Sequence, residues 1–183
     1  YASEPGHLVL DPFAGYGTTV AVAERMGRRV IGIELVPEHL EIARRRSAGH
    51  SRLILGHARD VSQLVDEPVD LVLTSPPYMA GASHPQNPLE GYATDDGNYA
   101  KYLRELGAIF GQVATLLRPR GRLVVNVANV VSTDGTVTPL ASDMAGVIDQ
   151  HVPLLGVTTL RWDVPPAGID GDYLLWFARP DAS

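Results

Sequence analysis

Apolar residues follow two alternating patterns along the chain. Short, nearly continuous apolar runs are typical of strands buried on both faces, and the segments between them repeat apolar residues every three to four positions, as amphipathic helices do. The runs predict strands at 7–13, 28–35, 52–56, 69–75, 121–130, 154–164 and 171–180. The helical spacing predicts helices at 17–27, 37–49, 98–118 and 138–151, with a turn or two of helix at 61–65.

This alternation predicts an α/β fold with a mostly parallel sheet and helices on both faces. The sequence shows no repeat, low-complexity tract or interdomain linker, so we expect residues 1–183 to form one domain. In such sheets ligands bind beyond the carboxyl ends of the strands, where the strand order reverses. We therefore look for chemistry at the ends of the first and fourth predicted strands.

Composition narrows the function classes. No apolar run approaches 18 residues and no amino-terminal export signal is present, so we expect no membrane association. The absence of cysteine excludes disulfides and thiolate metal sites and suits a cytoplasmic protein. No two histidines have metal-ligand spacing, so no metal is expected. The net charge of −6 argues against nucleic-acid binding by charge alone.

The first predicted strand ends in "DPFAGYGTT", residues 11–19. Gly15 and Gly17 permit positive φ and a close approach of the backbone to a ligand, and the following helix offers unpaired N–H groups. Glu34 closes the second strand, where an acid can accept hydrogen bonds from ribose hydroxyls. The pattern favours a nucleoside-containing cofactor, with a plain tight turn as the alternative. No Lys follows the glycines, which excludes a P-loop, and Val20 replaces the third glycine of a dinucleotide motif.

The fourth predicted strand ends in "TSPPY", residues 74–78. Prolines have fixed φ and no N–H, so this segment cannot continue a strand and its carbonyls are held in set directions. The Ser75 hydroxyl and the Pro76 carbonyl then form a rigid pair of acceptors. Pro165–Pro166 is interpreted as an ordinary loop.

Taken together, "DPFAGYGTT", "IGIEL" and "TSPPY" resemble the motifs of the S-adenosylmethionine-dependent DNA amino-methyltransferase family, which methylates cytosine N4 or adenine N6, with relatives acting on guanine N2 in RNA. The resemblance implies a seven-stranded Rossmann-like methyltransferase sheet whose last strand is antiparallel. It also implies S-adenosylmethionine as cofactor, bound by Asp11, Pro12, Phe13, Gly15, Gly17, Thr18, Thr19, Glu34 and Leu35.

The resemblance further implies the catalytic residues Ser75, Pro76, Pro77 and Tyr78. Acceptors on the two hydrogens of an exocyclic amine make its nitrogen a better nucleophile, so rate enhancement comes from positioning and directed dipoles. Ser75 and the Pro76 carbonyl would be those acceptors, and Tyr78 would stack on a base that is flipped out or single-stranded. Serine before the prolines favours cytosine N4.

Three features depart from the family pattern. Only "YASEPGH" precedes the glycine motif, where a helix is common. After strand three the chain has Gly56-His57 in place of a glycine followed by an acid, so Asp60 is the candidate for the adenine amino group, or else a cap of the short helix. The resemblance implies a nucleic-acid substrate, DNA before RNA. No recognition domain is visible, so we expect a separate recognition domain or subunit to supply sequence choice.

The remaining candidates are weaker. The segment 79–97 is long for a connection and is interpreted as a lid, with His84 as a solvated loop residue. The "RRR" run at 44–46 is interpreted as a solvated helix face. Asn126 either orients the catalytic loop or satisfies a buried backbone group, and Tyr99 with Tyr102 are interpreted as helix packing.

Two functions from other classes stay open. A nicotinamide-dependent oxidoreductase is disfavoured by Val20 and by the lack of a suitable proton donor in "TSPPY". A catalytically silent cofactor-binding module is the other alternative.

Overall fold

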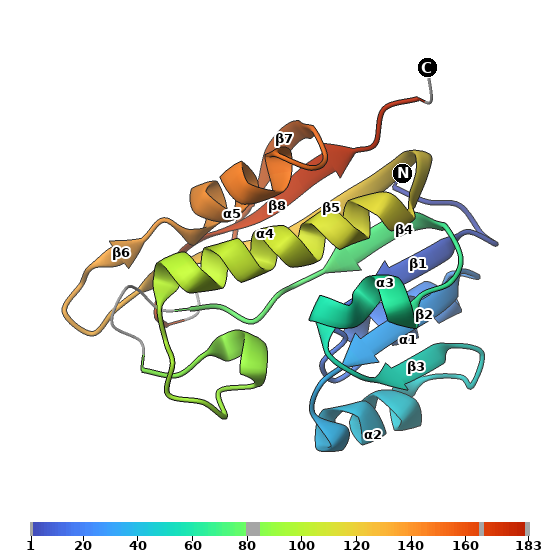
Figure 1. Cartoon of the computed structure of the whole chain (residues 1–183), viewed down its shortest axis with the longest axis horizontal. Coiled ribbons are helices and arrows are strands. Elements are labelled where there is room, and N and C mark those ends of the chain that lie inside the picture. Colours follow the sequence, from blue (N-terminus) through green and yellow to red (C-terminus); the bar gives the residue numbers. More distant parts are fainter. Residues whose placement is uncertain (1, 80–84, 165–166, 182–183) are drawn as a thin grey trace.

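A computed structural model describes residues 2–79, 85–164 and 167–181 of the chain (Figure 1). The strands are β1 (Leu8–Asp11), β2 (Arg29–Glu34), β3 (Arg52–Leu55), β4 (Val69–Thr74), β5 (Leu117–Val131), β6 (Val137–Thr138), β7 (Leu154–Leu160) and β8 (Ile169–Ala178). The helices are α1 (Thr18–Arg25), α2 (Pro37–Arg46), α3 (Val61–Leu64), α4 (Tyr99–Leu116) and α5 (Leu140–Asp149), with 3-10 turns η1 (Ala58–Asp60) and η2 (Pro88–Glu90).

The strands form one sheet in the order β3-β2-β1-β4-β5-β8-β7, with the two-residue β6 paired to β5. Neighbours from β3 through β5 are parallel, whereas β8 runs antiparallel to both β5 and β7. This arrangement confirms the predicted α/β class, with its seven main strands and antiparallel last strand. The order reverses between β1 and β4, so their ends flank a crevice, as expected.

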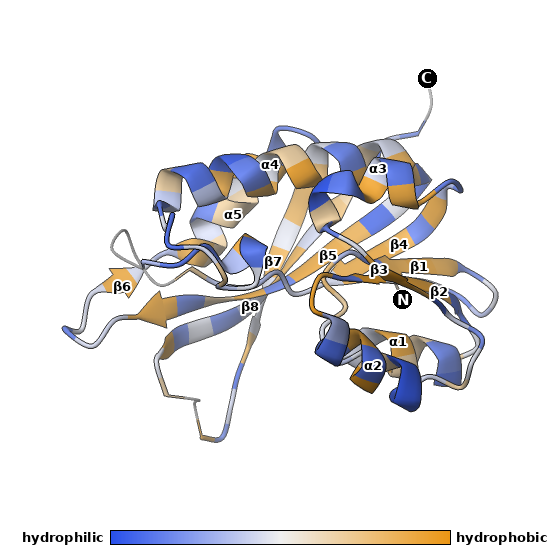
Figure 2. Ribbon diagram, turned by 60° about the horizontal axis from the view of Figure 1, so that its bottom comes forward, coloured by the Kyte–Doolittle hydropathy of each residue, from blue (hydrophilic) through white to orange (hydrophobic). Residues whose placement is uncertain are grey.

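Helices cover the two faces of the sheet unequally. In Figure 2, α1 and α2 lie on one side, beneath β1, β2 and β3, and α3, α4 and α5 lie on the other. The larger core fills the second side, where Tyr102 and Phe110 of α4 pack with Phe177 of β8. The smaller core beneath β1 includes Val9, Val20 and Leu71. Among the described residues no helix is long and apolar enough to cross a membrane.

Several boundaries differ from the sequence prediction because of proline. β1 ends at Asp11 and not at residue 13, since Pro12 has no N–H to continue the ladder. β4 likewise ends at Thr74, just before "SPP". The predicted helix 98–118 ends at Leu116, and β5 begins at once with Leu117.

Candidate active site

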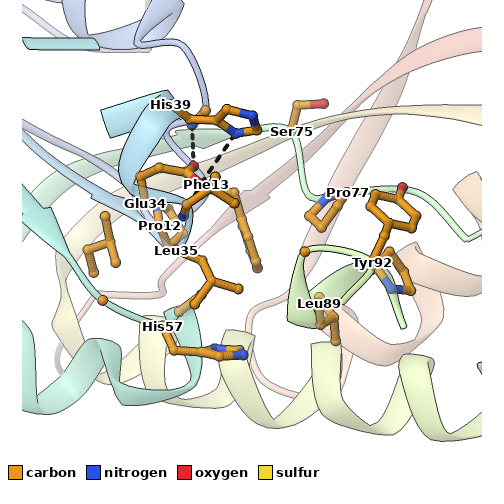
Figure 3. A pocket seen from close by; sticks show the side chains of 17 residues that line it. Pro12, Phe13, Glu34, Leu35, His39, His57, Ser75, Pro77, Leu89 and Tyr92 are labelled. Atoms are coloured by element: carbon orange, nitrogen blue, oxygen red, sulfur yellow. Dashed lines mark hydrogen bonds and ion pairs between the residues drawn. The ribbon is translucent and has the colours of Figure 1, made fainter. Parts of the chain in front are cut away.

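A cleft of about 220 Å³ opens at the carboxyl ends of the central strands (Figure 3). Figure 3 shows two walls, with Phe13, Leu35 and His57 on one side and Pro77, Leu89 and Tyr92 on the other. The lining residues are Pro12, Phe13, Gly15, Ile33, Glu34, Leu35, Val36, His39, Gly56, His57, Ala58, Ser75, Pro77, Pro88, Leu89, Gly91 and Tyr92. The cleft is therefore largely apolar, with one carboxylate, two histidines and the hydroxyls of Ser75 and Tyr92 among its lining.

The turn between β1 and α1 places Gly15 in the cleft lining. Gly15 has a φ of 52°, in the left-handed region that favours glycine. Gly17, with a φ of 77°, is buried, and a Cβ there would lie 2.7 Å from the Cβ of Ala43. Gly15 thus faces the cleft, whereas Gly17 allows α1 and α2 to approach each other.

Glu34, at the end of β2, holds this turn in place. Its carboxylate accepts hydrogen bonds from the N–H of Gly15 at 2.7 Å and from the N–H of Val36 at 2.8 Å, one on each oxygen. The residue is 8% exposed, and Nδ1 of His39 lies 3.6 Å from Oε1. Each carboxylate oxygen can accept a second hydrogen bond, so Glu34 can still receive ligand hydroxyls.

Asp11 lies beneath the cleft and does not line it. Its Oδ1 accepts hydrogen bonds from the hydroxyl of Thr74 at 2.6 Å and from the N–H of Phe13 at 3.1 Å. Burial raises the pKa of the Asp11 carboxyl, although these bonds and one from Thr19 favour the charged form. Asp11 therefore ties the end of β1 to the end of β4.

The "SPPY" segment contributes Ser75 and Pro77 to the cleft, while Pro76 is buried. The Ser75 hydroxyl lies 3.2 Å from the Tyr78 hydroxyl, which in turn lies 3.5 Å from the carbonyl of Asn126 in β5. Burial raises the pKa of Tyr78. The structure thus brings Tyr78 to Ser75 but places its ring outside the cleft lining.

The neighbours of this segment explain two residues left open by the sequence. The Asn126 side chain donates to Asp172 Oδ1 at 2.8 Å and to the main-chain carbonyl of Tyr173 at 3.3 Å, which agrees with the second expected role. Only its main-chain carbonyl contacts Tyr78, at 3.5 Å. Tyr102 is 1% exposed, stacks with Tyr99 and donates to the Pro77 carbonyl at 2.9 Å. The prediction of helix packing for this tyrosine pair is confirmed, and Tyr102 also supports the proline turn.

Three other expected cofactor residues lie outside the cleft lining. Thr18 and Thr19 line a separate surface hollow on the α1 side of the sheet. Asp60 ends η1, and its side chain makes no capping hydrogen bond to α3. Leu35, in contrast, lines the cleft as expected. Among the described residues no group of three or more His, Asp or Glu could hold a metal ion.

The segment after "SPPY", which is interpreted as a lid from the sequence, contributes to the cleft. Leu89, Gly91 and Tyr92, in and just after η2, line the cleft, which agrees with a lid. The Tyr92 hydroxyl donates to the Tyr78 carbonyl at 2.9 Å. His84 lies outside the described residues. His57 was not assigned from the sequence, because its partner Glu90 lies far along the chain.

Comparison with known proteins matches the amino-terminal quarter of the chain by sequence and nearly all of it by fold. A family model described as DNA methylase matches residues 1–45. The Type II methyltransferase M2.DpnII of Streptococcus pneumoniae is 53% identical over 45 residues, which are 25% of this chain and 17% of that protein. The matched region includes the glycine turn and Glu34 and stops before "TSPPY".

Two solved structures share the fold. TrmN from Thermus thermophilus has a TM-score of 0.69 and 17% identity, covering 97% of this chain and 45% of that one. The N-methyltransferase NodS from Bradyrhizobium japonicum has a TM-score of 0.68 and 12% identity, covering 97% of this chain and 88% of that one. The chain has the Rossmann-like fold of S-adenosylmethionine-dependent methyltransferases.

Proposed function

We propose that this chain is the catalytic domain of an S-adenosylmethionine-dependent methyltransferase that acts on an exocyclic amine of a nucleic-acid base, with DNA cytosine N4 or adenine N6 as the favoured targets. One observation carries the proposal. Ser75 and Pro77 of the proline turn open into the same cleft as Gly15 and Glu34. A nucleoside-binding turn and a rigid acceptor turn therefore face one space, as transfer between two bound molecules requires.

The residues of the cleft fit the cofactor. Glu34 retains acceptor capacity for both ribose hydroxyls, and the absence of a side chain at Gly15 leaves the backbone accessible. Leu35, Ala58 and Leu89 offer apolar surface for a purine ring. When bound, S-adenosylmethionine supplies an electrophilic methyl group on a sulfonium.

The acceptor amine is assigned to the Ser75 side of the cleft. With S-adenosylmethionine bound, the amine nitrogen would form its bond to the methyl carbon as the carbon–sulfur bond breaks, and one amine proton would leave past Ser75 to solvent. Hydrogen bonds from the amine to the Ser75 hydroxyl and the Pro76 carbonyl would localise the nitrogen lone pair. Ser75 is the acceptor that lines the cleft, whereas Pro76 is buried. Tyr78 orients the Ser75 hydroxyl through the 3.2 Å contact between the two oxygens. Stacking on the target base then requires the Tyr78 ring to become accessible.

Two variants separate cofactor binding from chemistry. Ser75→Ala and Tyr78→Phe are expected to cut methyl transfer by about tenfold or more while calorimetric affinity for S-adenosylmethionine stays nearly unchanged, because neither hydroxyl contacts the adenosine. Ser142→Ala, on the exposed side of α5, is the matched control for loss of a hydroxyl. Equal loss of cofactor affinity in the first two variants would show that the turn is structural.

The acceptor is tested with matched DNA and RNA oligonucleotides, because the sequence match to DNA methylases ends before the acceptor turn. Transfer to RNA alone would replace the DNA assignment with the RNA alternative. Affinity for S-adenosylmethionine without transfer to either would favour a silent cofactor-binding module. Affinity for NAD in place of S-adenosylmethionine would overturn the proposal.

A further inference from the structure

Two 3-10 turns, distant in sequence, face each other across the lower part of the cleft. η1 follows β3, with His57 and Ala58 in the cleft lining, and η2 contributes Pro88 and Leu89. In Figure 3 the His57 ring extends from its own wall toward the η2 wall, where Leu89 lies. The cleft therefore owes part of its shape to how η2 is held against η1.

The Glu90 carboxylate joins the two turns. Its Oε1 accepts a short hydrogen bond from the Arg59 guanidinium, and its Oε2 lies 3.5 Å from His57 Nε2. The Glu90 side chain is 26% exposed, that of His57 is 12% exposed, and that of Arg59, at the outer side of the contact, is 48% exposed. A charge-assisted bond that is partly shielded from water is worth more than one on an open surface. The Glu90 carboxylate thus connects the two walls of the cleft at a position that is partly shielded from water.

The state of His57 is fixed by its neighbours. Its Nδ1 accepts a hydrogen bond from the Arg59 N–H at 3.0 Å, so in the neutral ring Nε2 carries the hydrogen and points to Glu90. Burial, and then the Arg59 charge, lower the pKa of His57, which keeps the ring neutral near pH 7. Arg59 therefore supplies the charged hydrogen bond of this contact, whereas His57 Nε2 lies near the Glu90 carboxylate without a hydrogen bond to it.

A second anchor of the same segment lies elsewhere. Asp96 pairs with Lys101, in the first turns of α4, and this pairing lowers the pKa of Asp96 to about 2. That contact joins the segment to α4, the helix that follows it in the chain, and does not cross the cleft. A third contact, from the Tyr92 hydroxyl to the Tyr78 carbonyl, stays on the η2 wall. Of these three contacts, the one made by Glu90 opposes movement of η2 away from η1.

We propose that Glu90 is a positioning residue for the cofactor, which closes the η2 wall on η1 through Arg59 and His57 and thereby slows the release of S-adenosylmethionine. The inference rests on the proposed function. A ligand held between Leu35 and Ala58 on one side and Leu89 on the other leaves only when these walls part. Weakening the Glu90 contact lowers the barrier to that opening and changes the rate of release more than the rate of entry.

The test is a chase of tritiated S-adenosylmethionine from the whole chain with excess unlabelled cofactor. Glu90→Gln is expected to release label about tenfold faster than the unaltered chain, with the association rate changed by less than about threefold. Arg59→Gln, which removes the partner on the opposite wall, is expected to behave the same way and replaces Glu90→Gln if that variant does not fold. Asp95→Asn, an exposed acid on the same segment, is the matched control and should release at the original rate.

A charge swap distinguishes positioning from a general effect on stability. The double variant Glu90→Arg with Arg59→Glu should return the release rate to within about threefold of the original, whereas each single reversal should release faster. Release rates equal to the original in Glu90→Gln and Arg59→Gln overturn the inference while leaving the proposed function intact. Failure of the unaltered chain to bind the label overturns the proposed function and this inference with it.

Discussion

Glu34 shows how one side chain can serve the fold and the ligand together. Its two oxygens hold the N–H groups of Gly15 and Val36, so the residue shapes the turn before any ligand arrives. Removing the whole side chain would therefore disturb the fold as well as the cofactor. An amide is the sharper probe, because it keeps the shape but replaces one acceptor oxygen by a donor.

We expect Glu34→Gln to weaken S-adenosylmethionine binding by about 1.5 to 3 kcal/mol, roughly ten- to a hundredfold, because a charged acceptor of ribose hydroxyls is lost. The free energy of unfolding should fall by about 1 to 3 kcal/mol, since one buried N–H loses its acceptor. Calorimetry measures the first and thermal or urea unfolding the second. Glu38→Gln, exposed on the first turn of α2, is the control. Unchanged affinity in Glu34→Gln would remove the ribose assignment.

At the residue scale the sequence located the turns better than the contacts within them. Gly15, Glu34 and Ser75 reach the cleft because each sits at or just beyond the end of a central strand, and strand ends can be predicted from pattern. Thr18 does not, because the start of α1 turns it to the opposite side. His57 could not be assigned beforehand, because its partner Glu90 is 33 residues away in a segment without periodicity.

The packing of α1 on α2 depends on a missing side chain. Gly17 combines a φ of 77° with backbone so close to Ala43 that a Cβ would meet the Ala43 Cβ at 2.7 Å. Gly49 has a similar φ of 88° but open space where its Cβ would stand. Substitution of Gly49 therefore tests the cost of a positive φ alone, and substitution of Gly17 tests that cost together with the cost of a steric clash.

Gly49→Ala should lower the free energy of unfolding by about 1 to 2 kcal/mol, the cost of the left-handed conformation alone. Gly17→Ala should cost about 1 to 3 kcal/mol more than that, because α1 and α2 must move apart. Urea unfolding of both variants measures the difference. Equal losses would mean that the helices yield without cost at Ala43.

The ends of helices and strands were predictable where a proline sets them. They were less predictable where the apolar periodicity continues past the end of the element. Leu117 continues the apolar face of α4 and is buried, so the pattern extends the helix past its real end. Val69 pairs with Leu117 and Leu71 with Arg122, so the residues between Leu117 and Arg122 bulge out, with Arg120 at a φ of 63°. The two-residue β6 was not predicted, because it is too short to show a period.

The charge of the whole chain bears on how it binds nucleic acid. Its net charge is −6, and two acids of the segment after "SPPY" are already paired, Glu90 with Arg59 and Asp96 with Lys101. Reading a duplex needs phosphate contacts that fix register and an element that enters a groove. We expect the isolated chain to methylate a single-stranded or exposed base in preference to a duplex. Transfer to matched oligonucleotides at one fixed salt concentration measures this, and robust sequence-specific transfer to the duplex would contradict it.

The α/β class followed from the alternation of strands and helices, and the antiparallel last strand from the family resemblance, whereas the order of the strands within the sheet was not predicted. What alternation could not give is the unequal covering of the two faces or the second hollow beside α1. Both depend on which side chains meet over long sequence distances, and a linear pattern carries no such information.

The bond between Asp11 and Thr74 has a mechanical consequence. It pins the tips of β1 and β4 to each other from below, at 2.6 Å and out of reach of water. The ends of these two strands are therefore held at a fixed separation below the cleft. In the proposed methyltransferase, the spacing between the turn that would bind the cofactor and the turn that would bind the acceptor amine would be set when the chain folds, and would not have to be rebuilt in each turnover.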